Sequence, residues 1–579
     1  MSLIRIHHQS IAVAVVALAI TTLVGALLVR IEGAYLDHYP YFLDSSYYSW
    51  RGLFCLFRLI REPAIQVASS EIVWNDRFAL RTVPLIMFAP KLLGHKLGQL
   101  ATALPFFLLF ATLIGSTALR RTNSLLYATS VVALFGSLPI FYDFRIGLGT
   151  FWLDPVGALL VGACSICALN YTQESEKRWL IAFAAIAGLI PLTRYLSLAF
   201  LALVCGPVLL VHLLSVQIKN SKSIKKEIVI PYAIAAVVFS IVGGWYFLMH
   251  LGTNLFYYTN WGYDNNRGLL FSLKLMLPWF LDALGKPTLV VLVGFALYQI
   301  FSQFNGKSTN SENERTAPKG TNLFFFLWLA FSVLAFVIVV LHMSTEVYPG
   351  LYAIPGFLLA STFPNLLVKF EKLPSKAIKT VSILFFTAAI INFTTISMSL
   401  MWRASHPSVL AAATKQYNIA FSDFLAQRKP PYLWMSFVAN DAVTITYQCW
   451  QSHKFFAHLP PFPFFYFTTN NIFTGRRIAN EHATDSDTKK IITAADRWLD
   501  YALVLDDPQA AQKPENDWLE TQRARDMATT VAFEVSTNPS WKKVFTYDAP
   551  RYGRVACYHN TACNGLGFRS MMTGVDIRP

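Results

Sequence analysis

The sequence predicts a polytopic α-helical membrane protein with about eleven transmembrane helices and a C-terminal soluble α/β domain. Apolar residues make up 54% of the 579 residues, and charged residues make up only 14%. A soluble protein needs a charged surface, whereas a protein that faces lipid does not. Long apolar runs continue up to residue 402, and charged and turn residues recur after it. We therefore predict a membrane domain over 1–402 and a soluble domain over 403–579.

The apolar runs define the transmembrane helices. About 20 apolar residues in a helix cross a hydrocarbon core that is about 30 Å thick. Runs of this kind lie near 11–30, 97–119, 124–142, 151–170, 179–193, 196–216, 229–250, 284–302, 322–342, 349–366 and 378–401. Thr193-Arg194-Tyr195 separates two of them, which form either one hairpin with a tight turn or a less regular pair. No cleavage site of small residues follows the first run, so we expect it to remain as an anchor.

The positive charges of the loops predict the orientation. If the N-terminus is cytoplasmic, the cytoplasmic loops hold Arg120, Arg121, Lys177, Arg178, Lys219, Lys222, Lys225, Lys226, Lys307, Arg315, Lys319, Lys369, Lys372, Lys376 and Lys379. The short outer loops hold only Arg145, Arg194, Arg267 and Lys274. Cytoplasmic loops carry the excess of Lys and Arg, so the C-terminal domain is predicted to be extracytoplasmic. This topology explains the net charge of +15 without a nucleic-acid partner.

The first outer loop, 31–96, is long and partly apolar. Its segments 50–60 and 85–100 combine apolar faces with basic residues at helical spacing. This pattern is typical of helices that lie in the membrane interface.

The C-terminal part mixes strand and helix patterns. The segments 432–439, 464–469, 501–507 and 543–549 read as strands, and helical patterns lie between them at 413–427, 487–499 and 516–532. A small α/β domain is the predicted result. Cys557 and Cys563 are close in the sequence, which leaves a disulfide between them open.

Asp44 is the first residue that could carry chemistry. It stands in the aromatic segment 41–50, soon after the first apolar run. Partial desolvation raises the pKa of a carboxyl group toward that of a useful general base. The alternative is an ordinary loop aspartate or a helix N-cap. Tyr47 and Tyr48 of the same segment are candidates to line a substrate.

Asp154 and three arginines are further candidates. Asp154 opens an apolar run, where an ionisable residue faces a cavity or a partner, or caps the helix before Pro155. Arg194 either binds phosphate through its planar fork of donors or anchors the helices at the interface. Arg77 and Arg81, before the second run, admit the same two interpretations.

Two aromatic and polar segments complete the candidates. His342, Glu346 and Tyr348 form a polar corner, in which four-residue spacing of His and Glu is weak evidence for a metal. Tyr258 belongs to the aromatic loop 245–268, which either stacks against a sugar ring or sits in the interface. The sequence contains no phosphate-binding glycine loop, nucleophile elbow or CxxC pair.

In order along the chain, these features resemble the GT-C superfamily of membrane glycosyltransferases. The branch of the protein O-mannosyltransferases and lipid A aminoarabinose transferases is the most similar. The matching segments are LDSSYYSW at 43–50, RFALRTVPLIMFAPKLLG at 77–94, FRIGLGTFWLDPVGALL at 144–160, GLIPLTRYLSLAFL at 188–201, GGWYFLMHLGTNLFYY at 243–258 and VYPGLYAIPGFLLA at 347–360. Each motif is loose, and it is their order and spacing over the whole membrane portion that carry the resemblance.

The resemblance implies a sugar transferase at the outer face of the membrane. In this family a sugar passes from a polyprenyl-phosphate carrier to an acceptor. Asp44 would then be the general base of an inverting displacement, and Asp154 the second catalytic acid. Arg194 and an arginine of the 77–81 stretch would neutralise the carrier phosphate.

One departure from the family concerns the first loop. Many relatives carry two adjacent acids there, whereas Ser45 follows Asp44 in this chain. Since a second carboxylate often helps to hold a divalent metal, metal dependence stays open, and so does a loss of catalysis.

Two other classes of protein compete with the enzyme. A non-catalytic membrane scaffold or partner subunit on the same fold would use the C-terminal domain as its binding surface. A transporter would place charges at mid-membrane in two related halves, and this chain shows no repeated halves. With no eukaryotic retention signal, the expected location is the inner membrane of a bacterium. The sugar, the acceptor and the oligomeric state are not defined by the sequence.

Overall fold

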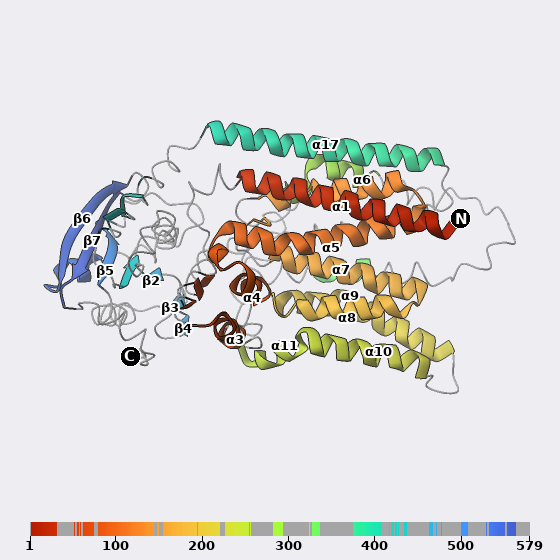
Figure 1. Ribbon diagram of the computed structural model, residues 1–579, viewed down its shortest axis with the longest axis horizontal. Helices are drawn as coiled ribbons and strands as arrows, with labels where there is room; N and C mark the ends of the chain where they lie inside the picture. The colour runs from red at the N-terminus through yellow and green to blue at the C-terminus, as the bar shows by residue number, and fades with distance from the viewer. Residues whose placement is uncertain are drawn as a thin grey trace. The chain divides into compact units, whose positions relative to one another are not determined.

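The computed structural model of the chain divides into two compact units (Figure 1). Met1–Ile31 and Cys55–Leu400 form the first, here called the helical unit, and Glu32–Phe54 and Met401–Pro579 form the second, the C-terminal unit. The structure describes residues 2–31, part of 51–63, 64–74, 79–143, 147–149, 154–193, 195–219, 226–253, 282–292, 327–335, 375–406, 433–436, 462–466, 500–507, 532–549, 553–562 and a few isolated residues.

The described part of the helical unit is built from long apolar helices. In chain order its elements are α1 (Ser2–Ile31), α3 (Ala64–Trp74), α4 (Ala79–Phe88), η2 (Pro90–Leu92), α5 (Lys96–Thr122), α6 (Leu125–Gly136), η3 (Pro139–Tyr142), α7 (Asp154–Glu174), α8 (Lys177–Leu189), α9 (Tyr195–Lys219), α10 (Lys226–Phe239), η4 (Ser240–Gly244), α11 (Trp245–Met249) and α17 (Ser375–Ser405).

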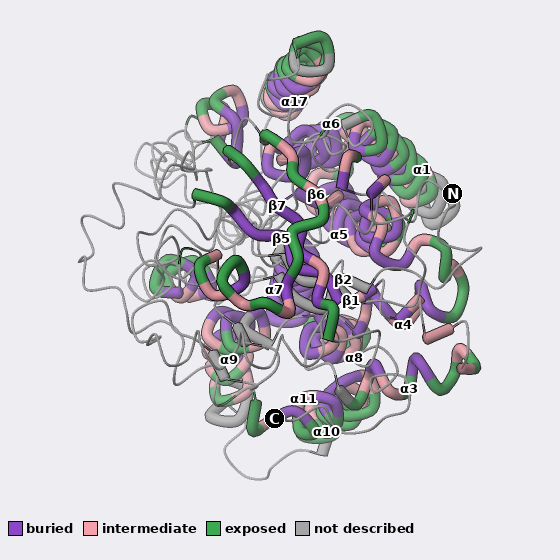
Figure 2. The backbone as a smooth tube through the Cα atoms, turned by 90° about the vertical axis from the view of Figure 1, so that its left-hand side faces the viewer, coloured by how far each residue is buried: buried purple, intermediate pink, exposed green. Residues whose placement is uncertain are grey.

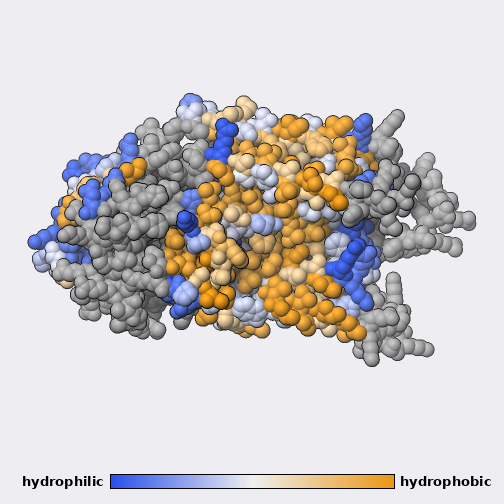
Figure 3. Space-filling view, viewed as in Figure 1, coloured by the Kyte–Doolittle hydropathy of each residue, from blue (hydrophilic) through white to orange (hydrophobic). Residues whose placement is uncertain are grey.

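Six helices in the described residues are long and apolar enough to cross a membrane. They are Gln9–Arg30, Lys96–Thr122, Pro155–Glu174, Ser197–Ser215, Val229–Met249 and Ile378–Trp402. Figure 3 shows hydrophobic side chains in a broad band over these helices and hydrophilic ones toward both helix ends. The polytopic fold is thereby confirmed. The total of about eleven spans stays a prediction, because the runs at 284–302 and 322–342 lie partly outside the described residues and the run at 349–366 lies wholly outside them.

Helix α7 is the centre of the helical unit. Every residue of its most apolar 18-residue window is buried, and Figure 2 shows the helix in purple. It packs against α5, α8 and α9. A helix that is apolar on all sides has no surface suited to water and is stable when other helices surround it. The central position of α7 fixes where its first residue, Asp154, enters the bundle.

Close helix approaches depend on small residues. A Cβ at Gly243 in η4, a π-helical turn, would collide with the carbonyl oxygen of Gly188 in α8. A Cβ at Gly136 in α6 would likewise collide with Ile20 of α1. Where lipid surrounds the helices, association depends on packing of this kind rather than on a hydrophobic driving force.

Arg120 and Arg121, which the predicted topology assigns to a cytoplasmic loop, both lie against Glu174 at one end of the bundle. The Glu174 carboxylate accepts hydrogen bonds from Arg120 Nη1 at 2.9 and 3.0 Å and from Trp179 Nε1 at 2.7 Å. It also lies 3.4 Å from Arg121 Nη2. These bonds tie the last turns of α5 and α7 to the first turn of α8. We call this the basic end, and the end that holds the α8–α9 turn the opposite end.

Replacing Glu174 tests this network. In Glu174→Gln one neutral amide faces two arginines, so we expect the free energy of unfolding to fall by about 1–3 kcal/mol. Thermal unfolding in detergent measures the loss. The matched control is Glu176→Gln, since the Glu176–Arg178 pair is exposed and an exposed pair contributes less than about 1 kcal/mol. Equal effects of the two substitutions would contradict the role given to Glu174.

The first outer loop differs from its predicted form. The described residues between 51 and 58 are helical, and α3 follows as a helix that the sequence did not indicate. The segment 85–100 is not one helix: α4 ends at Phe88, and α5 begins at Lys96. Pro90 has no N–H to donate within a helix, and Gly94 adopts a φ of +73°, which favours glycine.

The C-terminal unit contains a five-stranded sheet. Its strands are β1 (Leu433–Ser436), β2 (Phe462–Tyr466), β5 (Tyr501–Leu505), β6 (Trp541–Ala549) and β7 (Gly553–Asn560), in the order β2-β1-β5-β7-β6. The pairs β1–β2 and β1–β5 are parallel, and β5–β7 and β6–β7 are antiparallel. A second, two-stranded sheet pairs β3 (Asn470–Asn471) with β4 (Arg476–Arg477).

Each of the four predicted strands is present in the five-stranded sheet. Of the predicted helices, the described residues of 413–427 include helical Phe421 and Phe424. Both rings pack on Phe545 of β6, at 5.1 and 4.7 Å between centroids. The C-terminal α/β architecture is confirmed at this level. Cys557 is buried in β7, but Cys563 lies outside the described residues, so their disulfide stays untested.

Candidate functional site

The first turns of α7 and α9 lie against each other at the opposite end. A Cβ added at Gly157 in α7 would collide with the Ser197 hydroxyl of α9. Asp154 is the first residue of α7, and Arg194 directly precedes Tyr195, the first residue of α9. The fold therefore brings the backbone positions before these two helices to the same region of the helical unit.

The turn between α8 and α9 is tight. The N–H of Thr193 donates to the carbonyl oxygen of Ile190 at 2.9 Å, and Thr193 is fully buried. Of the two forms open from the sequence, the structure shows a hairpin with a short turn. Helix α4 holds this turn, because the Leu80 N–H donates to the Leu192 carbonyl oxygen at 2.9 Å.

Arg81 follows Leu80 and is buried, with 1% of its surface exposed. Its Nη2 donates to the carbonyl oxygen of Gln99 at 2.6 Å, and its Nε donates to Thr102 Oγ1 at 3.3 Å. Burial lowers the pKa of the Arg81 guanidinium to about 9, so the group stays protonated at neutral pH. Arg81 therefore carries a positive charge inside the junction of α4 and α5.

Two more contacts bring other segments to the opposite end. The Leu28 side chain of α1 lies in contact distance of the Cβ position of Gly149. His250, after α11, has its Nε2 3.0 Å from the carbonyl oxygen of Ile72 in α3. The end of α1, which precedes the Asp44 segment, and the end of α11, which precedes Tyr258, thus both belong to this end of the helical unit.

Most of the predicted site side chains lie outside the described residues. These are Asp44, Tyr47, Tyr48, Arg77, Arg194, Tyr258, His342, Glu346 and Tyr348. Asp154 is described as the start of α7, but its side chain is not. Arg81 is the one predicted site residue with a described side chain. The structure thus gives the arrangement of the elements, and the roles of all the predicted site residues, Asp154 and Arg81 included, stay predictions.

Two buried oxygens near these elements were not predicted. Ser197 and Gln99 are buried, and within the part of the chain that the structure describes the Ser197 hydroxyl and Gln99 Oε1 have no hydrogen-bond partner. Buried polar groups are normally satisfied, so these two oxygens are exceptions to the rule. A sequence signal existed for Ser197, because it is polar and stands one helical turn after Arg194 in an apolar run.

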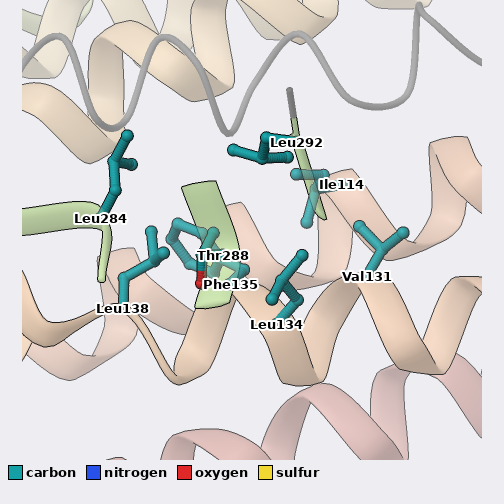
Figure 4. Close-up of a pocket in the computed structure, with 8 residues that line it drawn as sticks. All are labelled: Ile114, Val131, Leu134, Phe135, Leu138, Leu284, Thr288 and Leu292. Carbon is teal, nitrogen blue, oxygen red and sulfur yellow. The ribbon is translucent and has the colours of Figure 1, made fainter. Parts of the chain in front are cut away.

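A separate cavity lies between α5, α6 and the segment 284–292 (Figure 4). Its lining is apolar except for Thr288, whose hydroxyl accepts a hydrogen bond from Asn392 Nδ2 at 2.7 Å. Among its described lining residues there is no charged group that could bind a phosphate. Within the described residues, no group of three or more His, Cys, Asp or Glu side chains is placed to hold a metal ion.

Comparison with known proteins defines the class of fold. No protein-family model matches the sequence, and no curated protein matches it. Among solved structures, the chain is similar to ArnT from Cupriavidus metallidurans, determined bound to undecaprenyl phosphate. The match covers 95% of this chain and 98% of ArnT, with a TM-score of 0.52 and 13% sequence identity.

This likeness shows the fold. The chain shares with ArnT a polytopic helical membrane fold that is followed by a C-terminal sheet. The resemblance inferred from the order of the sequence motifs is thereby confirmed at the level of the fold.

Proposed function

We propose that this protein transfers a sugar from a polyprenyl-phosphate-linked donor to an acceptor hydroxyl. The observation that carries the proposal is the likeness, over nearly the whole of both chains, to an ArnT whose structure contains undecaprenyl phosphate. The gathering of α4, the start of α7 and the α8–α9 turn at one end of the helical unit supports it. These are the elements that hold or flank the predicted acids and arginines.

In the proposed reaction, Asp44 accepts the proton of the acceptor hydroxyl as the hydroxyl oxygen attacks the anomeric carbon of the sugar. The bond from that carbon to the phosphate oxygen breaks, and the electron pair leaves with the polyprenyl phosphate. Attack opposite the leaving group inverts the configuration. Fixed cations where this negative charge develops lower the barrier, and this is the role of Arg194 and of an arginine in the 77–81 stretch. Asp154 is the second acid of the site.

The proposal also includes the orientation in the membrane. Since positive loops face the cytoplasm, the basic end is cytoplasmic, and the opposite end faces the periplasm of a bacterial inner membrane. The membrane domain over 1–402 and the extracytoplasmic domain over 403–579 follow. A lipid-linked donor explains a site at the membrane surface, because the phosphate stays at the headgroup level while its chain stays in the bilayer.

Arg194 provides the test of donor binding. We expect Arg194→Gln to weaken binding of polyprenyl phosphate by about 10-fold to 100-fold, since a hydrogen bond to a charged group contributes about 1.5–3 kcal/mol. The affinity of the full chain in lipid nanodiscs is measured by competition with a labelled polyprenyl phosphate. Arg145→Gln, in another predicted outer loop, is the matched control. Unchanged affinity in Arg194→Gln would remove the arginine from the donor site.

The scaffold remains the competing function. It is favoured by Ser45, which stands where many relatives carry a second acid. A scaffold would bind no polyprenyl phosphate and would release none from a supplied polyprenyl-phosphate sugar. The same nanodisc preparation decides between the two functions.

A further inference from the structure

The Arg81 side chain bridges two helices. It extends from α4 to a single turn of α5, where its two described acceptors are the Gln99 carbonyl oxygen and the Thr102 hydroxyl. The Thr102 hydroxyl, which accepts from Arg81, lies 3.0 Å from the carbonyl oxygens of both Gly98 and Gln99 and shares its single proton with them. The guanidinium fork therefore enters a connected set of hydrogen bonds on α5. A fork of fixed geometry sets orientation as well as distance.

The packing around Arg81 leaves α4 little freedom. A Cβ at Gly98 in α5 would collide with the Leu92 carbonyl oxygen and lie 3.0 Å from the Leu85 side chain of α4. Leu85 and Ile86 belong to a buried cluster with Cys55, Val67, Ala68 and Leu93. Because interiors are packed at high density, a helix held in this way moves as a unit with its neighbours.

The residue before Arg81, Leu80, links the position of α4 to that of the α8–α9 turn. The Leu80 N–H donates to Leu192 at 2.9 Å, and Leu192 stands two residues before Arg194. The described turn is short, so a shift of α4 relative to α5 would pull directly on it. This hydrogen bond between Leu80 and Leu192 thus connects the Arg81-bearing helix α4 to the turn before Arg194, the predicted phosphate ligand.

We infer that Arg81 is a positioning residue, which locks α4 onto α5 and thereby fixes the α8–α9 turn that presents Arg194. The inference rests on the proposed function only for the role of Arg194. Within the 77–81 stretch, the phosphate contact then belongs to Arg77, and Arg81 acts through the backbone of α4.

Hydrogen exchange of the full chain in nanodiscs tests, without any ligand, whether Arg81 fixes the α8–α9 turn. We expect Arg81→Gln to speed exchange of the peptide over 190–197 about tenfold, the effect of losing a hydrogen bond to a charged group. Thr102→Val removes one acceptor of the fork, and about threefold faster exchange is expected. The double variant should match Arg81→Gln alone, because both changes break one set of bonds. Glu174→Gln, which destabilises the basic end, should leave this peptide unchanged.

Binding of polyprenyl phosphate gives the second measurement. Arg81→Gln and Arg81→Lys should both raise the dissociation constant, by the same factor at low and high salt, because a lysine restores the charge but not the fork. Arg194→Gln should instead reduce the salt dependence, since it removes a charge from the phosphate. The two variants therefore separate a positioning role from direct contact.

Unchanged exchange over 190–197 in the Arg81 variants, or rescue of binding by Arg81→Lys with loss of salt dependence in Arg81→Gln, would overturn the inference. If Arg81→Gln does not fold, Thr102→Val alone decides by the same exchange measurement. If the unmodified chain binds no polyprenyl phosphate, the proposed function fails, while the exchange measurement still decides whether Arg81 positions the turn.

Discussion

Asp44→Asn is expected to abolish sugar transfer while the protein still inserts and accumulates. A general base contributes about 10²-fold to 10⁴-fold to a rate, and the asparagine amide cannot accept the proton of the acceptor hydroxyl. The shape of the side chain is kept, so binding of polyprenyl phosphate should change little. Release of polyprenyl phosphate from a polyprenyl-phosphate sugar, measured in nanodiscs with an acceptor present, gives the rate.

Asp37→Asn is the matched control for Asp44→Asn, because Asp37 is another acid between the first apolar run and Asp44. It should keep the full rate. If Asp44→Asn also keeps it, the assignment of Asp44 as base is wrong, whatever the fold. If both variants lose activity and fail to accumulate, Asp44→Glu decides, since it keeps a carboxylate and should retain part of the rate only if that group takes the proton.

The sequence predicted the helices of the bundle well because lipid imposes a simple rule on length and polarity. The run at 97–119 became α5, and the run at 378–401 became α17. The strands 501–507 and 543–549 were found from their apolar and β-branched residues. In contrast, β7 was missed, although it lies between β5 and β6. Its buried stretch Val555–Tyr558 is continuous and lacks the alternation that marks a half-buried strand.

The candidate site was less predictable, because it depends on contacts between distant segments. No local pattern reveals that Leu80 bonds to Leu192 or that Gly157 meets Ser197. The break between α4 and α5 could have been read from Pro90 and Gly94, whose backbone properties outweigh the helical spacing of the basic residues around them. Arg81 was predicted as one of several phosphate ligands, and only the structure shows its bonds to α5.

Asp154→Asn is expected to lower the rate of transfer by at least about 100-fold, as losing a fixed charge at a reacting centre does. The two interpretations of Asp154 predict different results for this variant. Asparagine caps a helix about as well as aspartate, so a residue that only caps α7 would tolerate it apart from a helix-dipole contribution of about 0.3–1 kcal/mol. A residue that acts through its charge would not.

Asp154→Ser is the companion variant to Asp154→Asn. Serine also caps a helix, so both variants should keep the thermal stability of the protein, because α7 is surrounded by helices and its start packs on α9. Transfer should fall in both, and binding of polyprenyl phosphate should persist in both. Full transfer with either variant would assign Asp154 to the helix terminus alone. The same low rate in both, with unchanged unfolding temperature, would place the carboxylate of Asp154 in the reaction.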